Sequence, residues 1–273
     1  MRLRQIALAA TDLAAVVEEL TSVLGIEVGF RDPGVGVFGL ENAVMPVGET
    51  FLEVVSPVRD DAPASRWIAR RGGDAGYMVI LQCDDLAAQD REVARAEGAG
   101  ALKVWEGEHE GGRTAHFHPR VQGGRLGSRP TRSEPQASEE RAPAGLGAIL
   151  SFDAMPAWDE WVWAGPTWRD HVRTATTTAI TGAELASGDP EKLAARWGEI
   201  VGVAPVFDAE GRPALALPRG GRLVFVPGDA GDALVGVELA LADPQGFAAR
   251  ARERGVLGAD GAATIAGVRF IPT

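Results

Sequence analysis

Several features are scarce in this 273-residue chain, and each scarcity excludes a class of protein. The single cysteine, Cys83, cannot form an internal disulfide, which fits a reducing compartment. The N-terminal stretch MRLRQIALAATDL has too short an apolar run for a signal peptide or a membrane span, since Thr11 and Asp12 interrupt it. Acidic residues (38) outnumber Lys and Arg (27), and no basic stripe suited to phosphates is present. We therefore expect a cytoplasmic protein that binds neither nucleic acid nor membrane.

The chain contains an internal repeat. The stretches TGAELASGDPEKLAARW from residue 181 and VGVELALADPQGFAARA from residue 235 share a strand-like G-x-E-L-A and an Asp-Pro helix start, and two weaker copies lie upstream. Each copy has an aspartate suited to cap a helix and a glycine 12 or 13 residues later, where a helix commonly ends. The aspartates are Asp12, Asp85, Asp189 and Asp243, and the glycines are Gly25, Gly98, Gly202 and Gly255.

Strand-like segments follow each predicted helix. They are IEVGF, VGVFGL and TFLEVVSP after the first helix, ALKVWEG, RTAHFHP and GAILSFD after the second, and APVFD, PALALP and RLVFVPG after the third. The repeating unit is therefore βαβββ. The fourth copy has room for only about two strands of typical length, so we predict an α+β fold of four tandem βαβββ modules with the last module truncated.

The segments QIALAATDL, FLEVVSP and FHPRVQGG, set in tandem βαβββ modules, resemble the vicinal oxygen chelate superfamily. That group includes glyoxalase I, extradiol dioxygenases and bleomycin-resistance proteins, and GAILSFDAMPAWDEWVWAGPTW is similar to its uncharacterised glyoxalase-like branch. The resemblance implies that modules pair into two glyoxalase-like domains, each a cupped sheet around a cavity. It also implies a divalent metal held by the first and last strands of each module, and the scaffold hosts many reactions.

The resemblance places the metal ligands at defined positions. The first-strand position, seven residues before each helix cap, is occupied in module order by Gln5, Met78, Gly182 and Gly236, and the last-strand position by Glu53, Ser151 and Phe225. Only Gln5 and Glu53 are conventional oxygen ligands, so the resemblance implies a half-dismantled metal site. Met78 and Ser151 would then contact the substrate.

Glu53 lies in TFLEVVSP, a strand in which both faces are apolar. An isolated buried carboxylate is costly unless it is paired, protonated or bound to a metal. One interpretation is that Gln5 and Glu53 coordinate Mn, Fe, Ni or Zn with help from His116 or His118, which share a strand face. The other is a metal-free cavity in which Glu53 hydrogen-bonds Gln5 or an amine ligand.

Other polar groups leave alternatives open. His116 and His118 either handle a proton in the cavity or are satisfied strand residues, while Tyr77 should point away from the face of Met78. Glu184 and Glu238 are either a carboxylate pair in a second cavity or solvated or paired residues at a sheet edge.

We predict two domains, residues 1–155 and 174–273, joined by a Trp-rich linker at 156–173 that serves as an aromatic lid or an interdomain strap. Residues 123–145 lack the apolar residues to fold on their own and are predicted to form a mobile loop.

The predicted function is a glyoxalase-like lyase, isomerase or dioxygenase of unknown substrate, acting in the first cavity. There Glu53 would be ligand or general base, Gln5 would polarise a substrate oxygen, and His116 or His118 would handle a proton. The alternatives are a metal-free binding protein of the bleomycin-resistance kind and a noncatalytic scaffold. An exposed sheet edge in the last module would also allow a homodimer.

Overall fold

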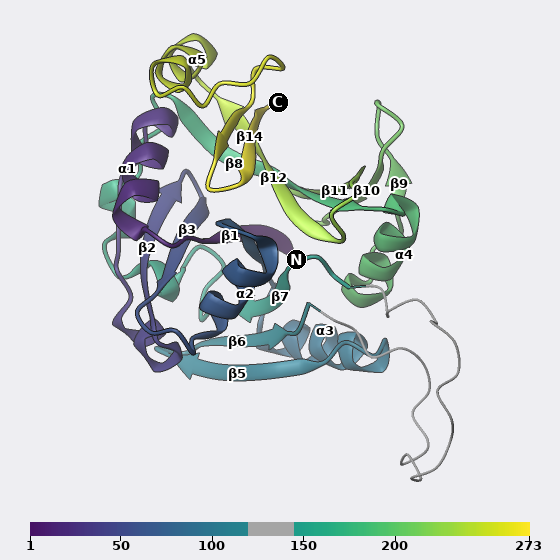
Figure 1. Cartoon of the computed structure of the whole chain (residues 1–273). Helices are drawn as coiled ribbons and strands as arrows, with labels where there is room; N and C mark the ends of the chain where they lie inside the picture. Colours follow the sequence, from purple (N-terminus) through teal and green to yellow (C-terminus); the bar gives the residue numbers. More distant parts are fainter. Residues whose placement is uncertain (120–144) are drawn as a thin grey trace.

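The structure is a computed structural model that describes residues 1–119 and 145–273, and its strands form two seven-stranded sheets (Figure 1). The predicted α+β class is confirmed. Apart from Gly145, the loop predicted to be mobile at 123–145 lies outside the described residues. No helix in the described part of the chain is both long and apolar enough to cross a membrane.

The first sheet is built from the first two predicted modules. Its strand order is β2-β3-β1-β4-β7-β6-β5. The first strands of the two modules, β1 and β4, pair antiparallel at the centre, and each pairs parallel with the last strand of its own module, β3 or β7. The two modules are thus related by an approximate twofold axis. The bounds are β1 Arg2–Ala9, β2 Leu40–Val47, β3 Thr50–Pro57, β4 Ala75–Gln82, β5 Lys103–His109, β6 Gly112–Phe117 and β7 Ile149–Ala154.

The second sheet repeats this plan with the last two modules. Its order is β13-β14-β12-β8-β11-β10-β9, with the antiparallel pair β8 and β12 at the centre. The bounds are β8 Thr177–Ser187, β9 Val206–Phe207, β10 Pro213–Ala216, β11 Arg222–Pro227, β12 Ala233–Leu241, β13 Ala263–Ile265 and β14 Val268–Pro272. The two sheets are drawn from residues on either side of the predicted linker, but they share one apolar core, so the two-domain division remains a prediction.

The predicted helix caps are confirmed. The side chain of each of the four aspartates accepts a hydrogen bond from a backbone N–H in the first turn of its helix, as an N-cap should. Gly25 and Gly202 end their helices in the left-handed conformation, whereas Gly98 is itself the last helical residue. The helices are α1 Leu13–Leu24, α3 Leu86–Gly98, α4 Pro190–Val201 and α5 Pro244–Glu253, and a further helix, α2 Pro63–Arg71, was not predicted.

Two strands predicted in the first module are wrong. IEVGF is reduced to an isolated bridge between Phe30 and Val44, and VGVFGL lies mostly in a 3-10 helix, η1 (Pro33–Phe38), which Asp32 caps. The strand that follows, β2, was missed because Pro46 argues against a strand; Pro is tolerated there because β2 is at the edge of the sheet. The first and fourth modules therefore both have two strands after the helix.

Each sheet has one face toward the other sheet and one facing outward. The helices α1, α3, α4 and α5 cover the inner faces, where α1 contacts α5 and α3 contacts α4 (Figure 1). Side chains such as Ile6 and Leu8 of β1 join Leu185 and Phe225 of the second sheet in the shared core. Alternate residues of each strand point away from this core, so the outer faces are where side chains are available to form a binding site.

The β2–β3 turn brings the first sheet against the second. Gly48 has φ 60°, and a Cβ there would collide with the backbone oxygen of Thr178 in β8. We expect Gly48→Ala to lower the free energy of unfolding by roughly 2 kcal/mol or more, from backbone strain plus the collision. Gly211→Ala is the matched control, since Gly211 has φ 75° with open space around it. Urea denaturation should show the larger loss for Gly48→Ala, and equal losses would contradict the collision.

Candidate functional site

The outer face of the first sheet forms a cavity of about 1370 Å³. Strands of both modules make its floor, and η1 and α2 contribute to its walls, which are largely apolar and aromatic. Five of the six residues predicted for the site line it, and the sixth, Ser151, is fully buried in the same strand as the lining residue Asp153. The lining residues predicted from the sequence are Gln5, Glu53, Met78, His116 and His118.

Glu53 is buried, with 7% of its surface exposed, and it is held by two amides. Nε2 of Gln5 donates to Oε2 of Glu53 at 2.9 Å, and Nδ2 of Asn42 donates to Oε1 at 2.7 Å. The hydrogen bond between Gln5 and Glu53 that the second interpretation predicted is present. Burial raises the pKa of the Glu53 carboxyl above its ordinary value, and the two amide donors oppose that rise.

The orientation of both amides is fixed by groups behind them. The indole Nε1 of Trp161 donates to Oε1 of Gln5 at 2.7 Å, and the backbone N–H of Asp32 donates to Oδ1 of Asn42 at 2.8 Å. An indole N–H can only donate, so the Gln5 oxygen must face it and the Gln5 nitrogen must face Glu53. The Trp-rich linker therefore sets the hydrogen bonding of the acid.

The Trp-rich linker packs on the outer face of the first sheet and also contributes to the cavity wall. Trp161 and Trp168 are buried, and both pack against Phe51, with ring centroids 5.9 Å and 5.0 Å away. Trp163 lines the cavity instead, and its buried Nε1 has no hydrogen-bond partner among the described residues. The linker is thus both an internal strap and part of the pocket wall.

A second buried acid, Asp153 of β7, was not found from the sequence. It lines the cavity and accepts hydrogen bonds from Oγ of Ser151 and, at 2.8 Å, from Oγ1 of Thr114. Burial raises the pKa of Asp153 from 3.8 to about 7, against the lowering effect of the two hydroxyl donors. The signal was present in ILSFDA, which places an acid in an apolar strand as TFLEVVSP does.

Ser151 is the structural equivalent of Glu53. In the parallel pair of the second module Ser151 faces Ile80, as Glu53 faces Ala7 in the first, and Ile80 and Ala7 lie at the same distance from their helix caps. The predicted alignment of these two positions therefore agrees with the register. Because Ser151 donates to Asp153, it would act on a ligand through that acid.

The two predicted histidines lie at the same wall. The ring of His116 packs against Trp105 with centroids 4.8 Å apart, and burial lowers the pKa of His116 to about 4, so its imidazole is uncharged at neutral pH. His118 also lines the cavity, and its backbone N–H donates to Leu102. An uncharged imidazole can accept or donate a hydrogen bond toward a ligand.

The prediction that Tyr77 points away from the cavity is wrong. Ala7 pairs with Met78 and Leu8 pairs with Gly76, so Tyr77 is an extra residue that forms a β-bulge in β4. The bulge breaks the alternation of side chains, and Tyr77 and Met78 both line the cavity. Burial raises the pKa of Tyr77 to about 12, which keeps its hydroxyl protonated.

The donor set does not fit a divalent metal. The Gln5 oxygen faces the Trp161 indole, and the Gln5 amide nitrogen, not its oxygen, faces Glu53, so the two predicted ligands do not turn their oxygens toward a common point. Within residues 1–119 and 145–273, no group of three His, Cys, Asp or Glu side chains could hold an ion. A divalent metal needs several such ligands converging on it.

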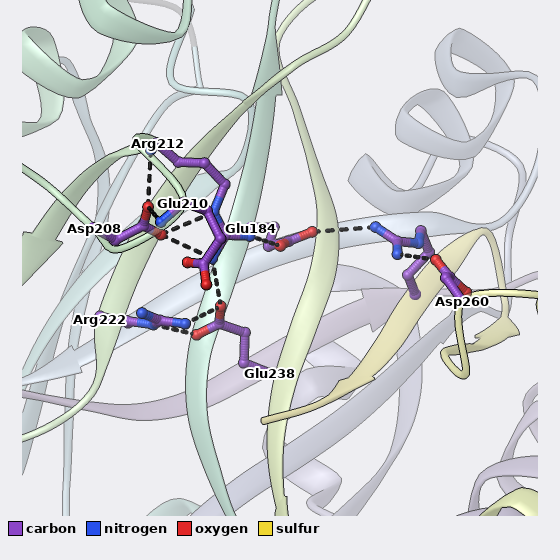
Figure 2. Close-up of polar contacts among 8 residues, drawn as sticks. Glu184, Asp208, Glu210, Arg212, Arg222, Glu238 and Asp260 are labelled. Carbon is purple, nitrogen blue, oxygen red and sulfur yellow. Dashed lines mark hydrogen bonds and ion pairs between the residues drawn. The ribbon is translucent and has the colours of Figure 1, made fainter.

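The equivalent face of the second sheet carries two further buried acids, each paired with arginine (Figure 2). Glu238 forms a two-pronged ion pair with Arg222, with hydrogen bonds of 2.6 and 2.7 Å. Glu184 bonds Arg212 at 2.9 Å and Arg269 at 3.4 Å. Both acids are therefore paired, as one of the alternatives predicted, but they lie on the central strands β8 and β12 and not at a sheet edge.

The predicted ligand positions of the second sheet are closed by these acids. A Cβ at Gly182 would collide with the Glu238 carboxylate, and one at Gly236 would lie 2.9 Å from Oε2 of Glu184. The predicted alignment of Phe225 is wrong by one residue, since Val224 faces Glu184 and Phe225 packs in the core against Trp197. A one-residue shift moves a strand residue to the other face.

Comparison with known proteins agrees with the repeated modules and the cupped sheet. The glyoxalase-like domain family matches residues 6–201, and the chain belongs to this family. The family match confirms the resemblance to the vicinal oxygen chelate superfamily that the sequence predicted. No curated protein matches the chain.

Two solved structures share the fold over most of the chain. A hypothetical protein from Staphylococcus aureus is 11% identical, with 100% of this chain and 99% of that chain covered and a TM-score of 0.61. A mutant of 4-hydroxymandelate synthase from Streptomyces coelicolor is 17% identical, with 94% and 75% covered and a TM-score of 0.61. Methylmalonyl-CoA epimerase from Streptomyces coelicolor, in complex with 2-nitronate-propionyl-CoA, is 17% identical over 57% of this chain and 99% of its own, with a TM-score of 0.42.

Proposed function

We propose that the chain is a small-molecule enzyme of glyoxalase-like type that binds its substrate in the first-sheet cavity without a metal. The observation that carries the proposal is the pair of buried acids, Glu53 and Asp153, which lie on strands of the two different modules and line one largely apolar cavity. Apolar cavities with a few convergent polar groups of shifted pKa are typical of substrate sites.

The two acids suit proton transfer. A general acid or base works best when its pKa lies near the working pH, and the pKa of Asp153 is about 7. Glu53, oriented by Gln5 and Asn42, would accept a proton or a hydrogen bond, and uncharged His116 would orient a polar group. Proton transfer of this kind favours lyase or isomerase chemistry over the predicted dioxygenase chemistry.

A ligand-sequestering protein is the second candidate. It is favoured by the hydrogen bonding of Glu53, because both of its oxygens already accept from the protein. Such a site would hold a compound without changing it. The predicted homodimer and cytoplasmic location remain predictions.

A cavity-filling variant tests the site. We expect Ile149→Trp, which adds bulk on the cavity wall, to weaken binding of the neutral dye Nile red by about tenfold or more, measured by dye fluorescence. Val58→Trp, at an exposed position outside the cavity wall, is the control and should bind as wild type does. Unchanged binding in Ile149→Trp would refute the cavity as the site, and loss of binding after dialysis against EDTA would refute the metal-free proposal.

Compounds that bind to the protein would then be released from it and analysed by mass spectrometry. Conversion by the wild type that is lost in Glu53→Gln and Asp153→Asn, at compound concentrations that saturate each variant, would support the enzyme. Recovery of unchanged compound in every case would support the sequestering protein instead.

A further inference from the structure

The geometry points to an organic cation with an apolar, ring-bearing body as the ligand of the first-sheet cavity. The inference rests on the proposed function and narrows it to a class of ligand: a quaternary ammonium or a protonated amine. It follows from the difference between the two sheets in the hydrogen-bond and ion-pair partners of the buried acids on their outer faces.

Among the described residues, the buried acids of the first sheet have uncharged hydrogen-bond partners. Glu53 accepts from the amides of Gln5 and Asn42, and Asp153 accepts from the hydroxyls of Ser151 and Thr114. Within the part of the chain that the structure describes, no Lys, Arg or charged His forms an ion pair with either acid. A buried carboxylate is strongly stabilised by a nearby positive charge, which residues 1–119 and 145–273 do not supply to these two acids.

The buried acids of the second sheet are paired with arginines. Glu184 lies at the position that corresponds to Ala7 in the first sheet, and it is paired with two arginines, while Glu238 is paired with a third (Figure 2). Thus the fold supplies its own cations to one set of outward-facing acids. The other set lines an open cavity, where a ligand can supply the charge.

The cavity wall suits a diffuse cation better than a metal ion. Trp67, Tyr77 and Trp105 line it, and aromatic faces attract ammonium groups. Each oxygen of Glu53 accepts one amide hydrogen bond, which fixes the position of the carboxylate in the wall, and an ammonium needs no fixed coordination geometry to be attracted to it. The carboxyl and guanidinium groups among the described lining residues also favour a cation, since four are acids, Asp32, Glu53, Glu108 and Asp153, and two are arginines, Arg66 and Arg70.

A pair of probes of equal shape isolates the charge. Naphthylmethyl-trimethylammonium and neopentylnaphthalene differ only in the nitrogen or carbon at the branch point. By calorimetric titration of the whole chain at about pH 8, we expect the ammonium probe to bind at least about tenfold more tightly. Glu53→Gln and Asp153→Asn should each weaken the ammonium probe by about tenfold and leave the neutral probe unchanged. Glu41→Gln, which removes an exposed acid from the neighbouring strand β2, is the matched control and should leave both affinities unchanged.

Each other outcome overturns the inference in an identifiable way. If the two probes bind equally, or the neutral one binds better, the cation preference is refuted while the small-molecule cavity stands. If neither binds, the inference and the proposed function both fail. If Glu41→Gln weakens the ammonium probe as much as Glu53→Gln does, overall charge is responsible rather than the cavity acids. Displacement of the probe by equimolar Mn²⁺ would assign the site to an inorganic cation.

Discussion

Replacing Trp161 by alanine is expected to lower the free energy of unfolding by about 3–5 kcal/mol, as for other large buried aromatic residues. Trp161 is 1% exposed and stacks on Phe51, and the guanidinium of Arg4 lies 5.4 Å from its ring. Alanine would leave a cavity under the sheet and remove the N–H that holds Gln5. Denaturation by urea, followed by far-ultraviolet circular dichroism, measures the loss.

Trp161→Phe separates packing from hydrogen bonding. Phenylalanine retains most of the stacking on Phe51 but cannot donate to Gln5, so we expect a smaller loss of about 1–3 kcal/mol. The amide of Gln5 would then be free to turn, and Glu53 would lose a fixed donor. A Phe variant as unstable as the Ala variant would show that the indole N–H, and not the packing, dominates.

Asp153→Asn is expected to remove a pH dependence from the stability of the protein. The pKa of Asp153 is raised from 3.8 to about 7 in the folded chain, so between these values the folded state keeps a proton that the unfolded state has lost. Folding stability from this group therefore falls as pH rises from about 4 to about 7 and is level above that. At 1.36 kcal/mol per pKa unit the loss amounts to at most about 4 kcal/mol.

Asparagine does not titrate, yet it can still accept hydrogen bonds from Ser151 and Thr114. The stability of Asp153→Asn relative to the wild type should therefore rise by a few kcal/mol between about pH 4 and pH 8, measured by urea denaturation at each pH. Asp60→Asn, which changes an exposed acid, is the control and should run parallel to the wild type. A constant difference between Asp153→Asn and the wild type would contradict a raised pKa at Asp153.

The two sheets share one topology but differ in the partners of the acids on their outer faces. Both repeat the same strand order around a central antiparallel pair, and both place acids on the outer face. In the second sheet, arginines neutralise Glu184 and Glu238, and those acids fill the space beside Gly182 and Gly236. In the first sheet the corresponding space remains a cavity, which is why we assign function there.

Much of the fold follows from local patterns. The aspartate caps and the helices after them were predicted correctly, because a cap interacts with backbone groups only about three residues away. The burial of Glu53 was also readable, since its neighbours in the strand are apolar on both faces. The strand β2 of the first module was not predicted; it contains Pro46, which is compatible with a strand only at the edge of a sheet, and a sequence does not show where the edge is.

The sequence by itself determined the four repeated modules, the capped helices and one buried acid, because each is encoded by residues close together in the chain. Only the tertiary structure decided which groups surround that acid. Trp161 lies 156 residues from the Gln5 amide that it orients, and the bulge that turns Tyr77 into the cavity appears only when β4 pairs with β1. The second acid at Asp153, raised in pKa by burial, follows from the same long-range packing, because burial and charge partners depend on segments that are distant in the sequence.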